Sequence, residues 1–344
     1  MAYNSTVVTS ALTKYVDQLS MDLVREMVLQ GRTQQFISVQ TGVKYADALN
    51  IMTSNLVVQP AGCGLINATG SVTLTQANLQ VCPLMVEEQI CLLGNNSLEQ
   101  YWTGMTLKKG SYYDELGPEM FAKAYIADKI DKLQGVIDDL IWVGASTGTP
   151  YSSDPNMAQC NGFLKLIDGT YNTSVVAVGA TNATYPTTTG GYTFSGAWST
   201  NTASPNYAIS VVDGMALALT QDLWDQEDLT LFLSYSEFRT YVMALRNSQP
   251  IAYNFPALES DGSLAYSIYH PGTNIRLVAT RGLKGTTRKV LTSAKNLYFG
   301  TDMQNDYESF RIWKSEDFNS IFFRAIWKQG VQIAYPQYVV ITTS

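Results

Sequence analysis

The side chains that most often carry chemistry in proteins are scarce and widely spaced in this sequence. Its four cysteines, Cys63, Cys82, Cys91 and Cys160, form no Cys-x-x-Cys pair, and His270 is the single histidine among 344 residues. A Cys/His zinc site has almost no ligands to draw on, so we expect no metal, and we expect no cofactor. The irregular cysteine spacing indicates free, mostly buried thiols in a reducing compartment.

Residues of the common catalytic classes do not combine into a site. A hydrolase of the triad type needs a histidine, and His270 stands beside Pro271 and Gly272 in a turn-like stretch. The run from Arg281 to Thr287 holds glycine and lysine without the spacing of a phosphate-binding loop, and we interpret it as a turn with solvated cations. We therefore expect no catalytic residue and predict that the protein is not an enzyme.

Paired carboxylates offer a second chemistry, because a glycosidase needs two of them facing each other across a sugar. Neighbouring residues on a helix or strand diverge instead of facing each other. This applies to the three adjacent pairs, Glu87/Glu88, Asp138/Asp139 and Glu316/Asp317. The Asp138/Asp139 pair falls on a helical pattern, where we expect it to form a solvated face.

A lysine amine that attacks an asparagine amide, with a carboxylate as base, would form an isopeptide link between subunits. Lys44 lies in an extended segment and could supply the amine. Any lysine and asparagine match so loose a pattern, and an ordinary surface role for Lys44 is therefore favoured.

The composition indicates that much of the protein's surface does not face water. Charged residues make up 15% of the chain, below the usual quarter, and 21 tyrosines offer large rings that suit either extended protein contacts or a β-rich fold. The net charge of −7 and the lack of a Lys/Arg run argue against tight wrapping of nucleic acid. The N-terminus lacks the pattern of a signal peptide and no stretch of about 20 apolar residues occurs, so we predict no membrane association.

Periodicity predicts elements of both kinds. We expect an amphipathic helix over residues 11–30, a projecting β-hairpin from Gln34 to about Cys91, and a long helix over 118–143. The Gly/Thr/Tyr-rich stretch from Gly144 to Pro205 reads as an exposed insertion. Further along we predict helices over 210–221 and from a Ser236 cap to 245, and strands at 229–233, 274–280, 289–291, 296–299, 310–313, 321–328 and 331–341.

The predicted hairpin is the best candidate for an interaction surface. It would expose Leu56, Val57 and Val58, which an isolated chain could not leave in water without cost. We therefore predict that these residues and Lys44 lie in contacts between subunits. A closed, symmetric assembly would supply the repeated neighbour.

The order of these elements resembles a known family. An arm, a long hairpin, one long helix, a mixed α/β region and closing strands occur in that order in major capsid proteins of tailed bacteriophages with the Hong Kong 97-type fold. The segments Asn296–Met303, Phe310–Trp313 and Phe323–Gln332 look like the closing strands of such coat proteins. Helix and strand segments are mixed without alternating, so the fold class is α+β.

The resemblance implies an architecture, an assembly and partners. The chain would form hexamers and pentamers of an icosahedral shell around double-stranded DNA that it contacts weakly and non-specifically. It would be assembled in the host bacterial cytoplasm and reside in the virion, with a portal and possible decoration proteins as further partners. The implied parts are an arm and helix (1–33), the extended loop (34–110), a peripheral domain with the spine helix (111–145), the inserted β-rich surface region (146–209), the axial domain (210–305) and C-terminal strands returning to the peripheral domain (306–344).

The sequence departs from the family in two places, and two alternatives stay open. No long charged coiled-coil segment precedes the arm, which implies a separate scaffolding protein or a shell that builds without one. The inserted region matches no counterpart. An encapsulin-like nanocompartment shell shares the same fold, and a virion-attached β-rich binding module would suit the Tyr/Thr/Asn-rich stretch 171–207, although the long helix argues against the latter.

Overall fold

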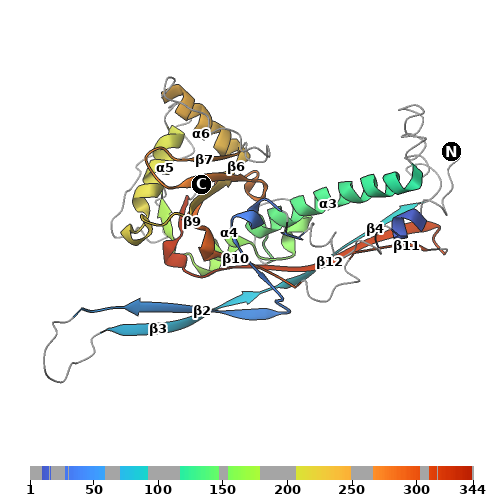
Figure 1. Ribbon diagram of the computed structural model, residues 1–344, viewed down its shortest axis with the longest axis horizontal. Coiled ribbons are helices and arrows are strands. Elements are labelled where there is room, and N and C mark those ends of the chain that lie inside the picture. Colours follow the sequence, from blue (N-terminus) through green and yellow to red (C-terminus); the bar gives the residue numbers. More distant parts are fainter. Residues whose placement is uncertain are drawn as a thin grey trace.

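The structure is a computed structural model, and it describes most of the chain. The described residues are 10–14, 16, 28–29, 31–58, 70–91, 117–146, 154–178, 207–248, 266–302, 310–315 and 317–342, with side chains in the long helix described from Tyr125 onward. Figure 1 shows a compact half at one end, a long helix and long strands extending to the other, and a hairpin projecting beneath. Among the described helices, none is long and apolar enough to cross a membrane.

The compact half is built on a six-stranded sheet with the order β5-β13-β9-β6-β8-β7. Its central strand β6 (Leu229–Ser234) is buried along its whole length, and it pairs in parallel with β8 and antiparallel with β9. Helices α5 (Tyr207–Ala218) and α6 (Tyr235–Ser248) pack on this sheet around an apolar core. The other strands are β5 (Val176–Val178), β7 (Ser267–Tyr269), β8 (Arg276–Thr280), β9 (Val290–Ser293) and β13 (Val340–Thr342).

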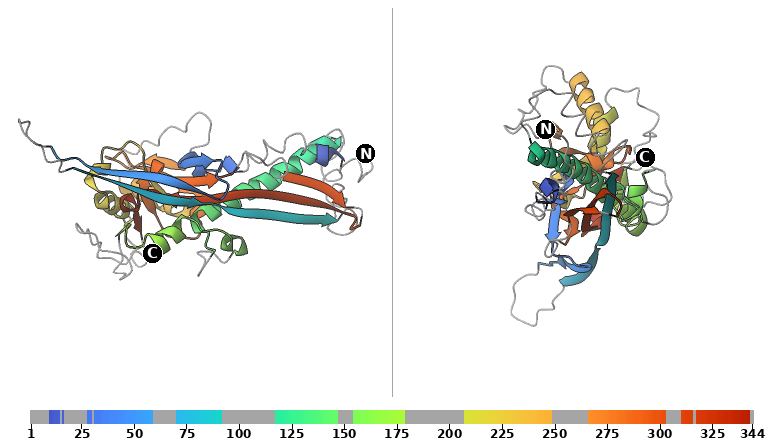
Figure 2. Two further views of the ribbon diagram at one scale, coloured as in Figure 1. Left: turned by 90° about the horizontal axis from the view of Figure 1, so that it is seen from below. Right: turned by 90° about the vertical axis from the view of Figure 1, so that its right-hand side faces the viewer.

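The elongated half is built on a second sheet, which has five strands. Strand β12 (Ser320–Ile333) is its longest member and pairs antiparallel with β4 (Cys82–Cys91), β10 (Leu297–Thr301) and β11 (Phe310–Ser315). The short strand β1 (Ser38–Thr41) pairs in parallel with β10. The left view of Figure 2 shows the long strands running beside the long helix.

The long helix α3 (Gly117–Val143) confirms the predicted helix over 118–143. Ile126, Ile130, Leu133 and Ile137 recur at three- and four-residue steps, and all four are buried in the core that the helix shares with the long sheet. On the solvent side Lys132 donates to Asp128 at 2.8 Å, a pair four residues apart that adds helical stability.

A two-stranded hairpin projects from the molecule. Strands β2 (Ala46–Asn55) and β3 (Ser71–Gln80) pair antiparallel over their whole length. The segment predicted as one hairpin is therefore divided, because β1 pairs with β10 and β4 pairs with β12 over ten residues, from Cys82 to Cys91.

Short 3-10, α and π turns join these elements. They are η1 (Thr33–Gln35), η3 (Pro155–Ala158), α4 (Phe163–Lys165), η4 (Leu166–Thr170), η5 (Gln221–Leu223), η6 (Arg281–Leu283), η7 (Ala294–Asn296) and η8 (Pro336–Tyr338). The predicted N-terminal helix is described at residues 10–14, 16 and 28–29, which are helical, with Leu12, Val16 and Val28 buried. Of the predicted exposed insertion, residues 147–153 and 179–206 lie outside the described part. The described residues 154–178 correct the prediction, because Met157, Phe163 and Ile167 are buried in the core beside α3.

The start of α6 corrects one prediction. The helix begins at Tyr235, and the hydroxyl of Ser234 accepts a hydrogen bond from the Glu237 N–H at 3.3 Å. Ser234 therefore caps this helix, and Ser236 lies inside the first turn. The Ser-x-x-Glu spacing from Ser234 to Glu237 is the pattern of a capping box.

The two halves of the molecule meet at a carboxylate that was predicted to be solvated. Asp138 is 3% exposed, and its two oxygens accept hydrogen bonds from the backbone N–H groups of Thr33 and Gly282, each at 3.2 Å. The indole of Trp142, one turn along α3, donates to the Thr33 hydroxyl at 3.0 Å. The prediction of a solvated Asp138 was wrong, because residues far away in the sequence cover this turn of the helix.

The cysteines correct another prediction. Cys82 and Cys160 form a disulfide, with their Cα atoms 6.0 Å apart, whereas both were predicted to be free thiols. Cys91 is free and exposed, so its predicted burial was also wrong. Cys63 lies outside the described residues.

Candidate assembly surfaces

The described part of the hairpin carries a concentration of exposed apolar side chains. Met52 and Leu74 are direct cross-strand partners, and they are 63% and 75% exposed. Val72 lies two residues before Leu74 and therefore on the same face of the ribbon. Leu56 and Val58, just beyond β2, are 86% and 96% exposed, and the remaining exposed apolar side chains are those of Tyr45 and Val57.

The outer hairpin is also uncharged. Between Ala48 and Val58, and between Gly70 and Gln80, no residue carries a charged side chain. Strands β2 and β3 form a sheet of two strands, so the outer edge of each presents backbone N–H and C=O groups without a ladder partner among the described strands. Soluble proteins usually protect such edges with charges or a cover, and a bare two-stranded ribbon is marginally stable in water. This ribbon therefore has the properties of a surface that another chain covers.

The base of the hairpin is held firmly to the rest of the molecule. Leu49 and Leu79 are buried beside Val43 and Val81, in a small apolar cluster against which Tyr298 of β10 packs. The side-chain amide of Gln332 donates to the Asn78 carbonyl at 2.7 Å. Burial at the base and exposure beyond it make the hairpin an anchored projection.

A second candidate surface lies on the long sheet, on the face away from α3. Burial alternates along β12 from Ile321 to Gln329, with Phe323 and Ala325 buried toward α3 and Phe322 and Arg324 partly exposed on the other face. The rings of Phe322 and Trp313 stack at 5.5 Å. The guanidinium groups of Arg324 and Arg311 lie 5.0 and 5.8 Å from the Trp313 ring, in the range of cation–π attraction.

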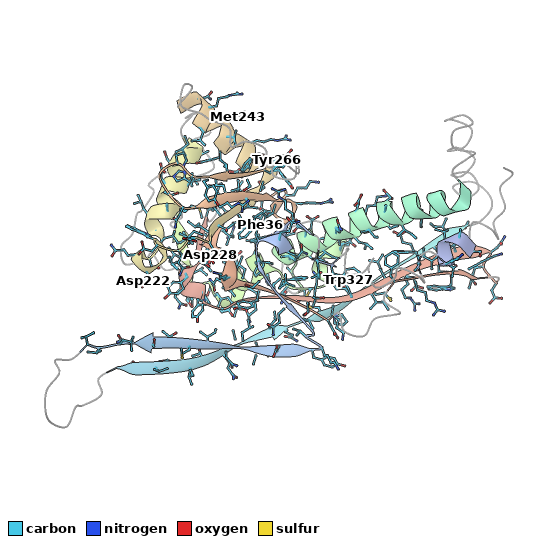
Figure 3. All side chains as sticks on the ribbon, viewed as in Figure 1. Phe36, Asp222, Asp228, Met243, Tyr266 and Trp327 are labelled. Carbon is cyan, nitrogen blue, oxygen red and sulfur yellow. A yellow bond between two sulfur atoms is a disulfide. The ribbon has the colours of Figure 1, made fainter. Side chains whose placement is uncertain are left out.

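A groove of about 980 Å³ lies between the hairpin and the compact half. Met52 and Ser54 line it from β2, and Glu227, Asp228 and Lys295 line it from the compact half. Asp228 pairs with Lys295 at 3.3 Å and accepts a hydrogen bond from Ser293 at 3.1 Å. Asp228 is labelled in Figure 3 at the edge of the compact half that is nearest the hairpin.

The single histidine, His270, is buried and hydrogen-bonded to residues of two helices. The Nδ1 atom of His270 lies 2.6 Å from the Tyr241 hydroxyl, and Nε2 lies 2.8 Å from Asp213 Oδ1. The ring is 5% exposed and joins α5, α6 and the turn before β8. Its predicted position in a turn is confirmed, since the Thr273 N–H donates to the His270 carbonyl at 3.1 Å.

Two further segments whose residue types could support catalysis or phosphate binding form parts of turns and helix ends instead. The stretch Gly144-Ala145-Ser146-Thr147-Gly148, which was not predicted as a candidate, fits the Gly-x-Ser-x-Gly pattern of a hydrolase. Such a serine sits between a strand and a helix, whereas Ser146 follows the end of α3 and donates to Asn161 Oδ1 at 2.9 Å. The Arg281–Thr287 run forms a turn with exposed Arg281 and Lys284, as predicted. Across the described ranges, no group of three or more His, Cys, Asp or Glu residues could hold a metal ion.

The adjacent carboxyl groups of Asp138, which is buried, and Asp139, which is partly exposed, both have raised pKa values. Burial raises the pKa of the Asp138 carboxyl above its ordinary value, and hydrogen bonds from Thr33 and Gly282 oppose this shift. Burial also raises the pKa of Asp139 to about 6, although the Arg281 guanidinium, 3.8 Å away, lowers it.

Part of the exposed hairpin surface was predicted from the sequence, and the rest was not. Leu56, Val57, Val58 and Lys44 are all exposed where they were predicted to project. Met52, Val72 and Leu74 were not singled out. The alternation of Val72 and Leu74 with Ser71, Thr73 and Thr75 was the available signal, because it places two apolar residues on one face of a strand that carries no charge.

Comparisons with known proteins give the fold. No protein-family model matches the sequence, and no curated protein matches it. Among solved structures, a chain of the cyanophage A-1(L) capsid asymmetric unit matches with a TM-score of 0.52 and 13% identity, covering 89% of this chain and 90% of that chain. A chain solved for Mycobacterium phage Ogopogo has a TM-score of 0.48 at 12% identity, with 90% and 91% covered. A chain of the satellite phage P4 procapsid, which includes a size determination protein, matches with a TM-score of 0.46 and 10% identity. The match covers 94% of this chain and 90% of that chain.

The likeness to the cyanophage capsid chain spans nearly all of both proteins, so this protein has the fold of a phage capsid chain. Helices and sheets are mixed, as the predicted α+β class requires. The expected resemblance to major capsid proteins of tailed phages is confirmed at the level of the fold.

Proposed function

We propose that this protein is the major capsid protein of a tailed bacteriophage, which self-assembles into hexamers and pentamers of an icosahedral shell around double-stranded DNA. The observation that carries the proposal is the exposed, uncharged hairpin on a chain with a capsid fold. The hairpin exposes apolar side chains and unpaired strand edges, and both need a neighbouring chain.

Copies of the same chain are the best candidates for that neighbour. No described residue of the same chain buries Leu56, Val58 or Leu74, so head-to-tail contact between copies would place each hairpin on the next subunit. Such contacts build rings when the rotation between copies closes. Rings of this kind are the hexamers and pentamers of a shell. Leu56, Val57, Val58 and Lys44 remain our proposed inter-subunit contacts, and we add Met52, Val72 and Leu74.

The parts of the Hong Kong 97-type fold correspond to the described elements as follows. The β2–β3 hairpin would be the extended loop, α3 the spine helix, and the six-stranded half the axial domain. Because β4 pairs with β12 along its whole length, we assign residues 82–91 to the peripheral domain, together with α3 and the closing strands. Leu12, Val16 and Val28 pack in this chain's own core, and the part of the arm before residue 10 would overlap a neighbouring subunit.

The proposed partners follow from a shell. The net charge of −7 supports weak, non-specific contact with packaged DNA, because few cations are available to neutralise phosphates. A separate scaffolding protein, a portal and possible decoration proteins complete the set. Assembly would take place in the host cytoplasm, and the finished protein would reside in the virion.

Electron microscopy of the purified chain, expressed alone and with its neighbouring genes, tests the proposal. We expect closed angular shells, or capsomer rings and tubes. Nuclease-protected DNA inside the shells would support a phage coat, whereas shells that enclose protein cargo would support a compartment. A chain that stays monomeric under every condition would contradict the proposal.

Hairpin variants make the test specific. Leu56→Asp, Val58→Asp and Leu74→Asp should leave a folded, soluble chain that builds no closed shells, because a charge would be buried at each contact. Leu56→Met and Leu74→Met keep an apolar side chain of similar volume and should assemble. Normal assembly of the aspartate variants would remove the hairpin from the contact.

A further inference from the structure

We propose that Cys82 and Cys160 are a thiol pair that stays reduced during assembly and is oxidised to a disulfide once the particle leaves the reducing cytoplasm. The inference rests on the proposed coat function for its timing. The pair links the beginning of β4, at the base of the hairpin, to the loop that follows η3. It would act as a covalent staple that is set after assembly.

The fold brings the two cysteines together through contacts that do not depend on the disulfide. On one side, the Val81 N–H donates to the Tyr45 carbonyl at 3.0 Å, and Cys82 stands opposite Gln329 in the β4–β12 ladder. This fixes the chain at Cys82. The sheet therefore fixes the position of the Cys82 thiol whether or not the disulfide has formed.

The loop that carries Cys160 is fixed just as firmly. The Ala145 N–H donates to the Met157 carbonyl, and the Gly162 N–H donates to the Gly144 carbonyl, each at 2.8 Å. Gly162 lies so close to the end of α3 that a Cβ atom would come within 2.7 Å of the Leu140 carbonyl oxygen. Because neither anchor involves a sulfur atom, the reduced thiols should already be neighbours.

The exposure of the two sulfur-bearing residues sets the order of the chemistry. Cys160 is 2% exposed, and its Sγ lies 3.5 Å from the Gln329 carbonyl oxygen, whereas Cys82 is partly exposed. A low-molecular-weight disulfide from outside would therefore meet Cys82 first.

The reaction is two successive thiol–disulfide exchanges. The Cys82 thiolate attacks one sulfur of the small disulfide, forming a mixed disulfide and releasing one small thiolate. The Cys160 thiolate then attacks Sγ of Cys82, forming the protein disulfide and releasing the second small thiolate. The two protons lost by the cysteines end on the two small thiols, and the small disulfide is the oxidant that is reduced.

The location of the staple gives it a mechanical role. Strand β3 ends at Gln80, two residues before Cys82, and crosses β12 so closely that a Cβ on Gly330 would lie 2.0 Å from the Gln80 carbonyl oxygen. Any load that a neighbour places on the hairpin reaches the body of the subunit here. A disulfide at this crossing ties the hairpin base to the end of α3.

Thiol mapping and particle stability test the inference together. Shells are collected from cells lysed in iodoacetamide, and a second sample is incubated with oxidised glutathione before denaturation and labelling. We expect label on Cys82 and Cys160 in the first sample and a Cys82–Cys160 linked peptide in the second. Oxidation should raise the temperature of shell disassembly by several degrees, and dithiothreitol should reverse the rise.

Matched variants separate this pair from other thiols. Cys82→Ser, Cys160→Ser and the double variant should assemble and lose the oxidant-dependent rise, whereas Cys91→Ser, on the same strand, should keep it. A pair already linked at lysis, a pair still labelled after oxidation, or a rise that survives in the double variant would each overturn the inference. Failure of the coat function would be visible separately as missing shells, while the labelling is still read on the soluble chain.

Discussion

Asp138 in α3 accepts a hydrogen bond from the backbone N–H of Gly282, 144 residues further along the chain. A second bond from Thr33 makes this carboxylate the common partner of the long helix, the segment before β1 and the turn after β8. This carboxylate therefore helps to fix the relative position of the two halves, together with the apolar core in which Leu283 and Val290 of the compact half pack with Ile137 of α3.

Replacement of Asp138 should lower stability in a graded way. Asp138→Ala leaves two buried N–H groups without their acceptor and should cost roughly 2–5 kcal/mol of unfolding free energy. Asp138→Asn keeps one acceptor oxygen and should lose about half as much. Urea unfolding of the unassembled chain, followed by circular dichroism, measures both. Asp131→Asn, exposed on the same helix, should change the free energy by less than about 0.5 kcal/mol. Equal changes in unfolding free energy for all three variants would show that the hydrogen bonds of Asp138 do not stabilise the fold.

Asp139 should make stability fall as pH rises through weakly acidic values. Its pKa is about 6 in the folded chain and 3.8 as its ordinary value, so between these values the folded state binds the extra proton. The contribution is greatest below pH 3.8 and is lost by about pH 6. Asp139→Asn should remove on the order of 1 kcal/mol of this dependence, since the partly exposed carboxylate is screened by water. Unfolding curves of both proteins from about pH 4 to about pH 7 measure it. Parallel curves would contradict the assignment.

Gly282 should tolerate no side chain. An added Cβ would lie 2.2 Å from the Asp138 carbonyl oxygen and 2.4 Å from Cδ1 of Trp142, and neither the helix backbone nor the buried indole can move aside cheaply. We expect Gly282→Ala to lose several kcal/mol or to accumulate as insoluble protein. Gly169→Ala, where an added Cβ meets nothing within 4 Å, is the matched control and should remain soluble. The soluble yield and melting temperature of the two variants measure this difference, and equal values for both would contradict the prediction.

A charge in the core face of α3 should prevent folding. Ile137 is fully buried, so Ile137→Asp would place an unpaired carboxylate among apolar side chains at a cost of several kcal/mol. Ile137→Val removes one methylene and should cost about 1 kcal/mol. Expression yield and the near-ultraviolet circular dichroism spectrum report the difference. A soluble aspartate variant with the wild-type spectrum would place this face of the helix outside the core.

Elements with a regular local pattern could be predicted from the sequence. The three- and four-residue steps of α3 and the alternation of buried and exposed residues in β12 arise from local geometry, which sequence periodicity records directly. The exposed group Leu56, Val57 and Val58 could be found for the same reason, since an apolar run beside turn residues is visible without a partner.

Features that depend on distant residues could not be predicted. Asp138 is buried because Thr33 and Gly282 cover it, and nothing near Asp138 in the sequence records that contact. The Cys82–Cys160 pairing needs the register between β4 and β12, which spacing alone does not reveal. The division of the predicted hairpin at Gln80 has the same origin, because the partner of β4 lies more than 200 residues away, with Cys82 opposite Gln329.

The lack of charge on the outer hairpin has a physical consequence for whatever it holds together. Contacts made by residues 48–58 and 70–80 should be little affected by salt, since these two segments carry no charged side chain that salt could screen. The hydrophobic part of such contacts weakens on cooling. A particle joined through this ribbon should therefore survive large changes in ionic strength and loosen first in the cold.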